Sequence, residues 1–119
     1  MKLHVDLKER GYDIVMERGV LHRLAQEVDL NRNVLLVSDS KVPVQWIDAV
    51  KEQCPHCVVK IVPSGEESKS FAVWEELLSC MLEHHFLRSD LVIALGGGVV
   101  GDLAGFAAAC YMRGIDFVN

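Results

Sequence analysis

Hydrophobic and polar residues alternate at the start of the chain in the pattern of a short antiparallel hairpin. Leu3, Val5 and Leu7 alternate with polar neighbours, and segment 12–17 is strand-like again after a turn at 9–11. A period of two is typical of strands that have one exposed face. The pattern therefore predicts an N-terminal hairpin at the edge of a sheet.

The rest of the chain alternates between short apolar runs and longer segments with helical spacing. Continuous apolar runs lie at 34–37, 58–62, 91–95 and 115–118. Apolar residues recur at helical spacing in segments 20–28, 44–54, 71–82 and 99–112. Strands without alternation are covered on both faces, as in a parallel sheet. The pattern predicts an α/β fold, namely a Rossmann-like open, mostly parallel sheet with helices on both faces and the hairpin at its edge.

Segment 91–113 joins a buried strand, a glycine turn and an apolar helix. The three consecutive glycines at 96–98 lack Cβ atoms, so the backbone can turn sharply and another molecule can approach it closely. A helix that begins directly after such a turn presents unpaired N–H groups and the positive end of its dipole. We expect this turn to bind phosphate. Asp102, placed in the first helical turn, is expected to accept hydrogen bonds from sugar or substrate hydroxyls.

Other interpretations of this segment are open. A buried strand and helix without any ligand would show the same pattern. Gly96, Gly98 and Gly101 satisfy G-x-G-x-x-G, but the acidic residue expected at the end of the next strand is missing. A membrane span is disfavoured, because the apolar stretch contains five glycines and the charged Asp102.

Two polar segments, 38–41 and 63–70, follow predicted strands and should lie at the carboxyl edge of the sheet, where open α/β sheets bind ligands. In the second segment, Glu66 is placed to accept from ribose hydroxyls and Lys69 to donate to an oxygen-rich group. Solvated loop charges are the alternative for this pair. Helix capping by Ser40 or Asp39 is an equally good account of the first segment.

The composition and net charge of the chain argue against some classes of binding partner. The chain has 119 residues, 50% of them hydrophobic, which suits one domain with its own core. The net charge of −5 argues against a nucleic-acid or anionic-membrane surface, so any phosphate must be held by local geometry. The first residues contain no apolar signal region, and we expect a cytoplasmic protein.

The four cysteines are expected to be reduced in that compartment. Residues 54–57 spell C-P-H-C, a sequence used by thiol oxidoreductases. Redox pairs lower the pKa of the first thiol at a helix N-terminus, whereas the helical pattern here ends at Cys54. We interpret Cys54 and Cys57 as a structural or incidental pair rather than a redox centre. No further ligands complete a zinc site.

Segment 96–114, GGGVVGDLAGFAAACYMRG, closely resembles the signature of 3-dehydroquinate synthases. P-S-G-E-E-S-K at 63–69 resembles a second motif of that family, and V-S-D-S-K at 37–41 resembles a weaker third. The resemblance covers the whole chain in order. It implies that residues 1–119 form the N-terminal NAD-binding domain, apparently truncated after its last strand, and that the C-terminal metal and substrate domain is absent.

The resemblance implies a cytoplasmic lyase of the shikimate pathway, which leads to chorismate and the aromatic amino acids. Such enzymes convert 3-deoxy-arabino-heptulosonate 7-phosphate to 3-dehydroquinate and phosphate through transient oxidation by NAD, with zinc or cobalt as divalent metal. It further implies a homodimer when the chain is full length, and no nucleic-acid or membrane partner. A sister sugar-phosphate cyclase that acts on a heptulose 7-phosphate and a non-catalytic nucleotide-binding domain stay open as alternatives.

The resemblance also implies roles for single residues. Cofactor-binding positions of the family correspond to Asp39, Ser64, Gly65, Glu66, Lys69, Gly97, Gly98, Val99, Gly101 and Asp102. Arg113 matches an arginine that reaches substrate phosphate across a dimer interface, although capping of its own helix is the alternative. The family's metal ligands and catalytic lysines lie in later sequence. The chain by itself is therefore expected to hold no catalytic residue, bind no catalytic metal and be inactive.

Overall fold

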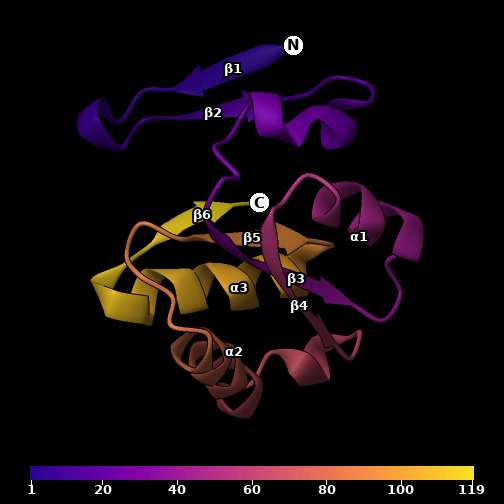
Figure 1. Ribbon diagram of the computed structural model, residues 1–119, viewed down its shortest axis with the longest axis vertical. Helices are drawn as coiled ribbons and strands as arrows, with labels where there is room; N and C mark the ends of the chain where they lie inside the picture. Colours follow the sequence, from indigo (N-terminus) through magenta and orange to yellow (C-terminus); the bar gives the residue numbers. More distant parts are fainter.

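The computed structural model describes all residues from 1 to 119 as a four-stranded parallel sheet with helices on both faces, joined to a separate two-stranded hairpin (Figure 1). The main sheet has the strand order β4-β3-β5-β6. The strands are β1 (Lys2–Val5), β2 (Tyr12–Val15), β3 (Asn33–Asp39), β4 (His56–Val62), β5 (Leu91–Leu95) and β6 (Asp116–Val118). The α-helices are α1 (Val44–Lys51), α2 (Phe71–Glu83) and α3 (Gly98–Cys110), and the 3-10 helices are η1 (Lys8–Arg10), η2 (Val20–Gln26), η3 (Glu66–Ser68) and η4 (Tyr111–Arg113).

The register of the sheet brings the ends of its central strands to one edge. Asp39 at the end of β3 pairs with Val62 of β4, and Ser38 pairs with Leu95 of β5. The Ser38 side chain is fully buried and its hydroxyl donates to the carbonyl oxygen of Leu95 over 2.7 Å. The segments that follow β3, β4 and β5 therefore emerge together, as the sequence predicted.

Alternate residues of the central strands enter two separate cores, because successive side chains of a strand point to opposite faces. One core contains Leu35, Val37, Val92 and Ala94 together with buried residues of α2 and α3. The other contains Val34, Leu36, Leu91 and Ile93 together with α1, and partly buried residues of η2 pack against it. This arrangement confirms the predicted sheet with helices on both faces.

The N-terminal hairpin is confirmed, although it forms a sheet of its own instead of extending the main one. Figure 1 shows it standing apart from the main sheet, with η2 beside β2 and above α1. Its apolar face is open: Leu3 pairs with Ile14, and these side chains are 47% and 41% exposed. The opposite face is polar and carries a contact of 2.8 Å between Nδ1 of His4 and Oδ1 of Asp13.

Two predicted helices differ in detail from the structure. Segment 20–28 contains only the 3-10 helix η2 (Val20–Gln26), which is kinked at Arg23 (φ −131°). Helix α3 ends at Cys110 and is followed by η4, in which Met112 and Arg113 have φ values of 47° and 64°. No helix of the structure has the length and apolar character that crossing a membrane requires, α3 included.

Candidate functional site

The glycine turn after β5 leaves backbone amides unpaired at the start of α3. Gly97 is the N-cap residue and no side chain caps the helix. The first intrahelical bond runs from the N–H of Gly101 to the carbonyl oxygen of Gly97, over 3.0 Å. The N–H groups of the residues before Gly101, among them those of Gly98 and Val99, thus have no partner within the helix. They provide hydrogen-bond donors at the positive end of the helix dipole.

The space beside this turn is open. A Cβ atom added to Gly97 or Gly98 would meet no atom within 4 Å. By contrast, a Cβ atom on Gly96 would lie only 3.0 Å from Cγ2 of Val100, so Gly96 is needed for packing inside the turn. Because protein atoms do not cover Gly97 and Gly98, a diphosphate can approach the backbone there. The residues present therefore fit the phosphate part of a dinucleotide.

Lys69 and Asp102 form an ion pair at the same edge of the sheet. The Nζ atom of Lys69 donates to Oδ2 of Asp102 over 2.7 Å, and both side chains are largely exposed. The hydrogen bond to Asp102 and the charge of that carboxylate raise the pKa of Lys69. The expectation that Asp102 lies in the first turn was wrong: α3 begins at Gly98, which makes Asp102 its fifth residue.

Asp39 stabilises the turn that follows β3. Its Oδ1 atom accepts hydrogen bonds from the backbone N–H groups of Lys41 (2.8 Å) and Val42 (3.1 Å). The expectation of helix capping by Asp39 was wrong in detail, because the N-cap residue of α1 is Pro43 and no side chain caps that helix. The neighbouring Ser40 accepts a bond of 3.1 Å from the N–H of Ser64, which ties the loop after β3 to the loop after β4. Both predicted segments thus lie side by side.

The loop after β4 is shaped by local hydrogen bonds. The Ser68 hydroxyl donates to the carbonyl oxygen of Pro63, and the Ser70 hydroxyl caps α2 by accepting from the N–H of Val73 over 3.3 Å. Gly65 has φ +106°, a backbone conformation that favours glycine. The side chain of Glu66 is exposed. Its place on the loop puts it at the same edge as Lys69.

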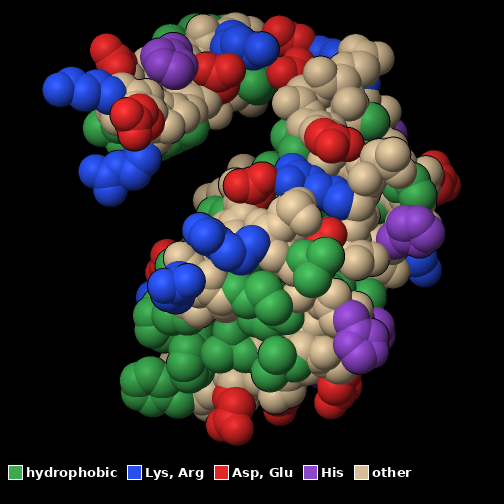
Figure 2. Space-filling view, turned by 60° about the vertical axis from the view of Figure 1, so that its left-hand side comes forward, with side chains coloured by type: hydrophobic (Ala, Val, Ile, Leu, Met, Phe, Trp, Pro, Cys, Tyr) green, Lys and Arg blue, Asp and Glu red, His purple; other side chains and the backbone are tan.

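An apolar groove of ≈ 290 Å³ lies between α2 and α3, next to the ion pair. Its walls are Lys69, Ser70, Phe71, Trp74, Asp102, Leu103 and Phe106. Trp74 stacks on Phe106 with ring centroids 5.1 Å apart. Figure 2 shows apolar side chains gathered over these helices, and Phe71 is 76% exposed. The sequence interpretation missed this groove. A signal was present, because α3 is apolar on all sides and such a helix is usually buried on more than one side.

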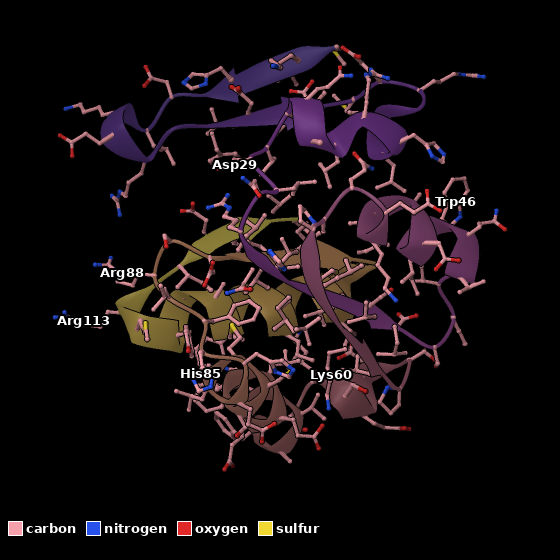
Figure 3. All side chains as sticks on the ribbon, in the orientation of Figure 1. Asp29, Trp46, Lys60, His85, Arg88 and Arg113 are labelled. Carbon is pink, nitrogen blue, oxygen red and sulfur yellow. The ribbon has the colours of Figure 1, made fainter.

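Two predicted site residues lie elsewhere. Arg113 follows the opposite end of α3, about 20 Å from the glycine turn for a helix of 13 residues. Figure 3 shows its side chain pointing away from the sheet, on the same side as Arg88.

Gly101 is the second of these residues. A Cβ atom on Gly101 would lie 3.1 Å from Oδ1 of Asn119, so this glycine allows α3 to pack beside β6. Its role in cofactor binding stays a prediction.

The two thiols of C-P-H-C lie at the other edge of the sheet, where α1 leads into β4. Both are free; Cys54 is buried and its Sγ atom donates to the carbonyl oxygen of Val50 over 3.4 Å. Interaction with the Cys54 thiol lowers the pKa of Cys57, and the same interaction together with burial raises the pKa of Cys54. No group of three or more His, Cys, Asp or Glu side chains is arranged to hold a metal ion.

Comparison with known proteins identifies the family to which the chain is similar. The family model described as 3-dehydroquinate synthase N-terminal matches residues 59–119. A 3-dehydroquinate synthase of Clostridium botulinum is 40% identical over 99% of this chain and 36% of its own length. A 3-dehydroquinate synthase of Nitrobacter winogradskyi is 45% identical over 97% of this chain and 32% of its own length. The chain thus spans about a third of these relatives.

Solved structures agree on the fold. The crystal structure of 2-deoxy-scyllo-inosose synthase complexed with carbaglucose-6-phosphate, NAD+ and Co2+ superposes with a TM-score of 0.88 at 23% identity, over 98% of this chain and 34% of the other. ValA, a 2-epi-5-epi-valiolone synthase from Streptomyces hygroscopicus subsp. jinggangensis 5008 with NAD+ and Zn2+ bound, superposes with a TM-score of 0.77 at 26% identity, over 95% and 33%.

Proposed function

The chain belongs to the 3-dehydroquinate synthase N-terminal family, and from this premise we propose that it is the NAD-binding part of a 3-dehydroquinate synthase. The observation that carries the proposal is the open glycine turn. No protein atom covers Gly97 or Gly98, and the backbone N–H groups at the start of α3 have no partner within the helix. A diphosphate accepts hydrogen bonds from such amides without needing a positively charged surface. This suits a chain whose net charge is −5.

In the proposed site each residue has a binding role that its chemistry permits. The N–H groups of Gly98 and Val99 donate to the diphosphate, and Gly97 leaves room for it. Asp39, Glu66 and Lys69, with Ser64 and Gly65 of the same loop, lie toward the adenosine side. Asp102 accepts from a ribose hydroxyl.

The proposed reaction of the complete enzyme is the conversion of 3-deoxy-arabino-heptulosonate 7-phosphate to 3-dehydroquinate and phosphate, in the cytoplasm. Bound NAD would supply the transient oxidation of a ring hydroxyl to a ketone, which acidifies the neighbouring C–H so that phosphate can be eliminated before the hydride is returned. The chain's own share is to bind and orient the dinucleotide. Residues outside these 119 would supply the metal ligands and the proton-transfer groups, so we expect no turnover from the chain alone.

Arg113 supports a homodimer in this proposal. Its side chain is separated from the glycine turn of its own chain by the length of α3, and it points outward (Figure 3). An exposed guanidinium suits the recognition of a phosphate. We propose that Arg113 binds the substrate phosphate in the site of a neighbouring subunit.

Calorimetric titration with NAD+ tests the proposed site in the 119-residue chain. We expect Gly98→Trp to weaken binding at least about ten-fold, because the indole would fill the space that the diphosphate needs. Glu52→Trp, which places the same indole at an exposed position on the other side of the sheet, should bind like the wild type. Equal affinities of wild type and Gly98→Trp would contradict the proposal.

A sister sugar-phosphate cyclase is the second candidate, because the solved structures that superpose are cyclases of that kind. Their identities of 23% and 26% establish a common fold and leave the substrate open. Assays of the complete enzyme with the deoxyheptulosonate phosphate and with a heptulose 7-phosphate separate the two. Turnover of the heptulose phosphate alone would replace our proposal with this candidate.

A further inference from the structure

Two of the charged residues proposed for the cofactor site, Lys69 and Asp102, contact each other. Oδ2 of Asp102 accepts from the Nζ atom of Lys69 at 2.7 Å, while no other hydrogen bond engages the carboxylate. Oδ1 therefore stays available to a ligand. This pairing joins the loop after β4 to α3, two segments that are 33 positions apart.

The negative charge of Asp102 disfavours the binding of a diphosphate at the proposed site. The backbone of Asp102 lies one turn into α3, about 6 Å along the axis from that of Gly98, which is within the Debye length of physiological salt. A negative charge at that separation repels a diphosphate. The neighbouring Glu66 and Glu67 add to the negative potential. A cation fixed on Asp102 removes the largest part of this repulsion.

The backbone at Lys69 is positioned for that task. Its N–H donates to the carbonyl oxygen of Glu66 over 3.0 Å, and the next residue, Ser70, caps α2. Ser68 holds the loop by donating to Pro63. The flexible part of Lys69 is thus limited to its side chain, and the ion pair fixes the end of that side chain.

We propose that Lys69 is a positioning residue that acts through Asp102: it neutralises the carboxylate beside the diphosphate site and directs Oδ1 toward the ligand. The proposal rests on the proposed nucleotide site. It differs from a direct contact between Lys69 and the ligand, because it makes the effect of Lys69 depend on the presence of Asp102. A double-mutant cycle measures that dependence.

The test uses the 119-residue chain and inorganic pyrophosphate, with the backbone amide NMR signals of Gly98 and Val99 as the readout. Lys69→Met should weaken pyrophosphate binding about two- to five-fold, the range of a single exposed ion pair. In the Asp102→Asn background the same change should have a clearly smaller effect, because Lys69 is then no longer held beside the diphosphate. Raising the salt concentration should reduce the difference between wild type and Lys69→Met.

Lys41→Met is the matched control. Lys41 carries the same charge at the same edge of the sheet; the Asp39 carboxylate accepts from its backbone N–H, but no carboxylate pairs with its ammonium group. Its removal should have the same effect with and without Asp102. Equal losses for Lys69→Met in both backgrounds would overturn the proposal in favour of direct ligand contact.

The outcomes also separate this inference from the proposed function. Pyrophosphate binding that shifts Gly98 and Val99 and shows the expected coupling, without any binding of NAD+, would refute the nucleotide function and retain the role of Lys69. Pyrophosphate that leaves both amide signals unchanged would overturn the role of Lys69.

Discussion

The buried carboxylate of Asp90 accepts two hydrogen bonds from Asn33, one from the backbone N–H at 3.0 Å and one from Nδ2 at 3.3 Å. A third bond of 2.7 Å comes from the N–H of Leu87. These contacts connect the starts of β3 and β5, the two strands whose other ends form the candidate site. The site therefore depends on a polar cluster at the opposite edge of the sheet.

Replacing Asp90 with alanine should destabilise the fold by about 2–3 kcal/mol, because two backbone N–H groups would lose their acceptor in a buried position. Urea unfolding measures this change. Asp48→Ala, which removes an exposed carboxylate from α1, should alter the free energy of unfolding by less than about 0.5 kcal/mol. Similar effects of the two substitutions would show that the Asp90 cluster is not structural.

Tyr111 should make stability depend on alkaline pH. Its buried hydroxyl donates to the carbonyl oxygen of Phe86 over 2.8 Å, and burial, followed by the charge of Asp90, raises its pKa above the ordinary value of 10.0. The folded state then retains a proton that the unfolded state loses, so this stability is complete below pH 10 and falls as the pH rises beyond it.

Melting temperatures between about pH 9 and pH 11 test this dependence against Tyr111→Phe. The variant should lose about 1 kcal/mol at neutral pH, since the carbonyl oxygen of Phe86 loses its donor. It should also show a shallower decline at alkaline pH. Parallel pH profiles of wild type and variant would contradict the assignment to Tyr111.

The substitution Gly98→Ala should increase the stability of the fold and weaken the binding of NAD+. A Cβ atom there meets nothing within 4 Å, so Gly98→Ala should stabilise the fold by about 0.4–1 kcal/mol through lower entropy of the unfolded chain. The same methyl group occupies the space proposed for a diphosphate, so affinity for NAD+ should fall. Thermal unfolding and calorimetry on the same samples give both values.

Gly105→Val provides the contrast. A Cβ atom at Gly105 would lie 3.3 Å from the Phe117 ring, so the larger side chain should cost about 1–3 kcal/mol by forcing α3 away from β6. A stable Gly105→Val variant would mean that the packing of α3 on β6 is looser than the structure shows.

Cys57 should be alkylated before Cys54. The Cys54 thiol lowers the pKa of Cys57, and Cys54 itself is buried with a raised pKa. Iodoacetamide labelling near pH 8, followed by peptide mass spectrometry, measures the order. Cys54→Ala should slow the reaction of Cys57, because the thiol that stabilises its thiolate is gone. Faster or unchanged labelling of Cys57 in that variant would show that another group controls it.

The sheet could be predicted from the sequence because strands buried on both faces form continuous apolar runs, as at Leu91–Leu95. The glycine turn could be predicted for a similar reason, since no other residue type lets a ligand approach a backbone so closely. Local sequence does not specify pairings between distant segments. The contact of Lys69 with Asp102, the bond from Ser64 to Ser40 and the groove beside Trp74 all depend on how α2 and the loops pack after the chain has folded.

The first residue of α3 could not be predicted from the sequence either. The apolar pattern does not say whether the helix begins at Gly98 or a few residues later, and that shift moves Asp102 from the first turn to the second. The separate hairpin could not be foreseen because a half-apolar ribbon has the same alternation whether it extends a sheet or stands alone.

The length of α3 separates Gly98 from Arg113 in one subunit, and this affects the activity of dimers formed from two different variants. In the proposed dimer each catalytic centre takes its glycine turn from one polypeptide and its arginine from the other. Gly98→Trp and Arg113→Ala would each inactivate a pure population of the complete enzyme. Mixed dimers, however, would reunite an intact turn with an intact arginine in one of their two centres, so random mixing should recover about a quarter of wild-type activity by interallelic complementation.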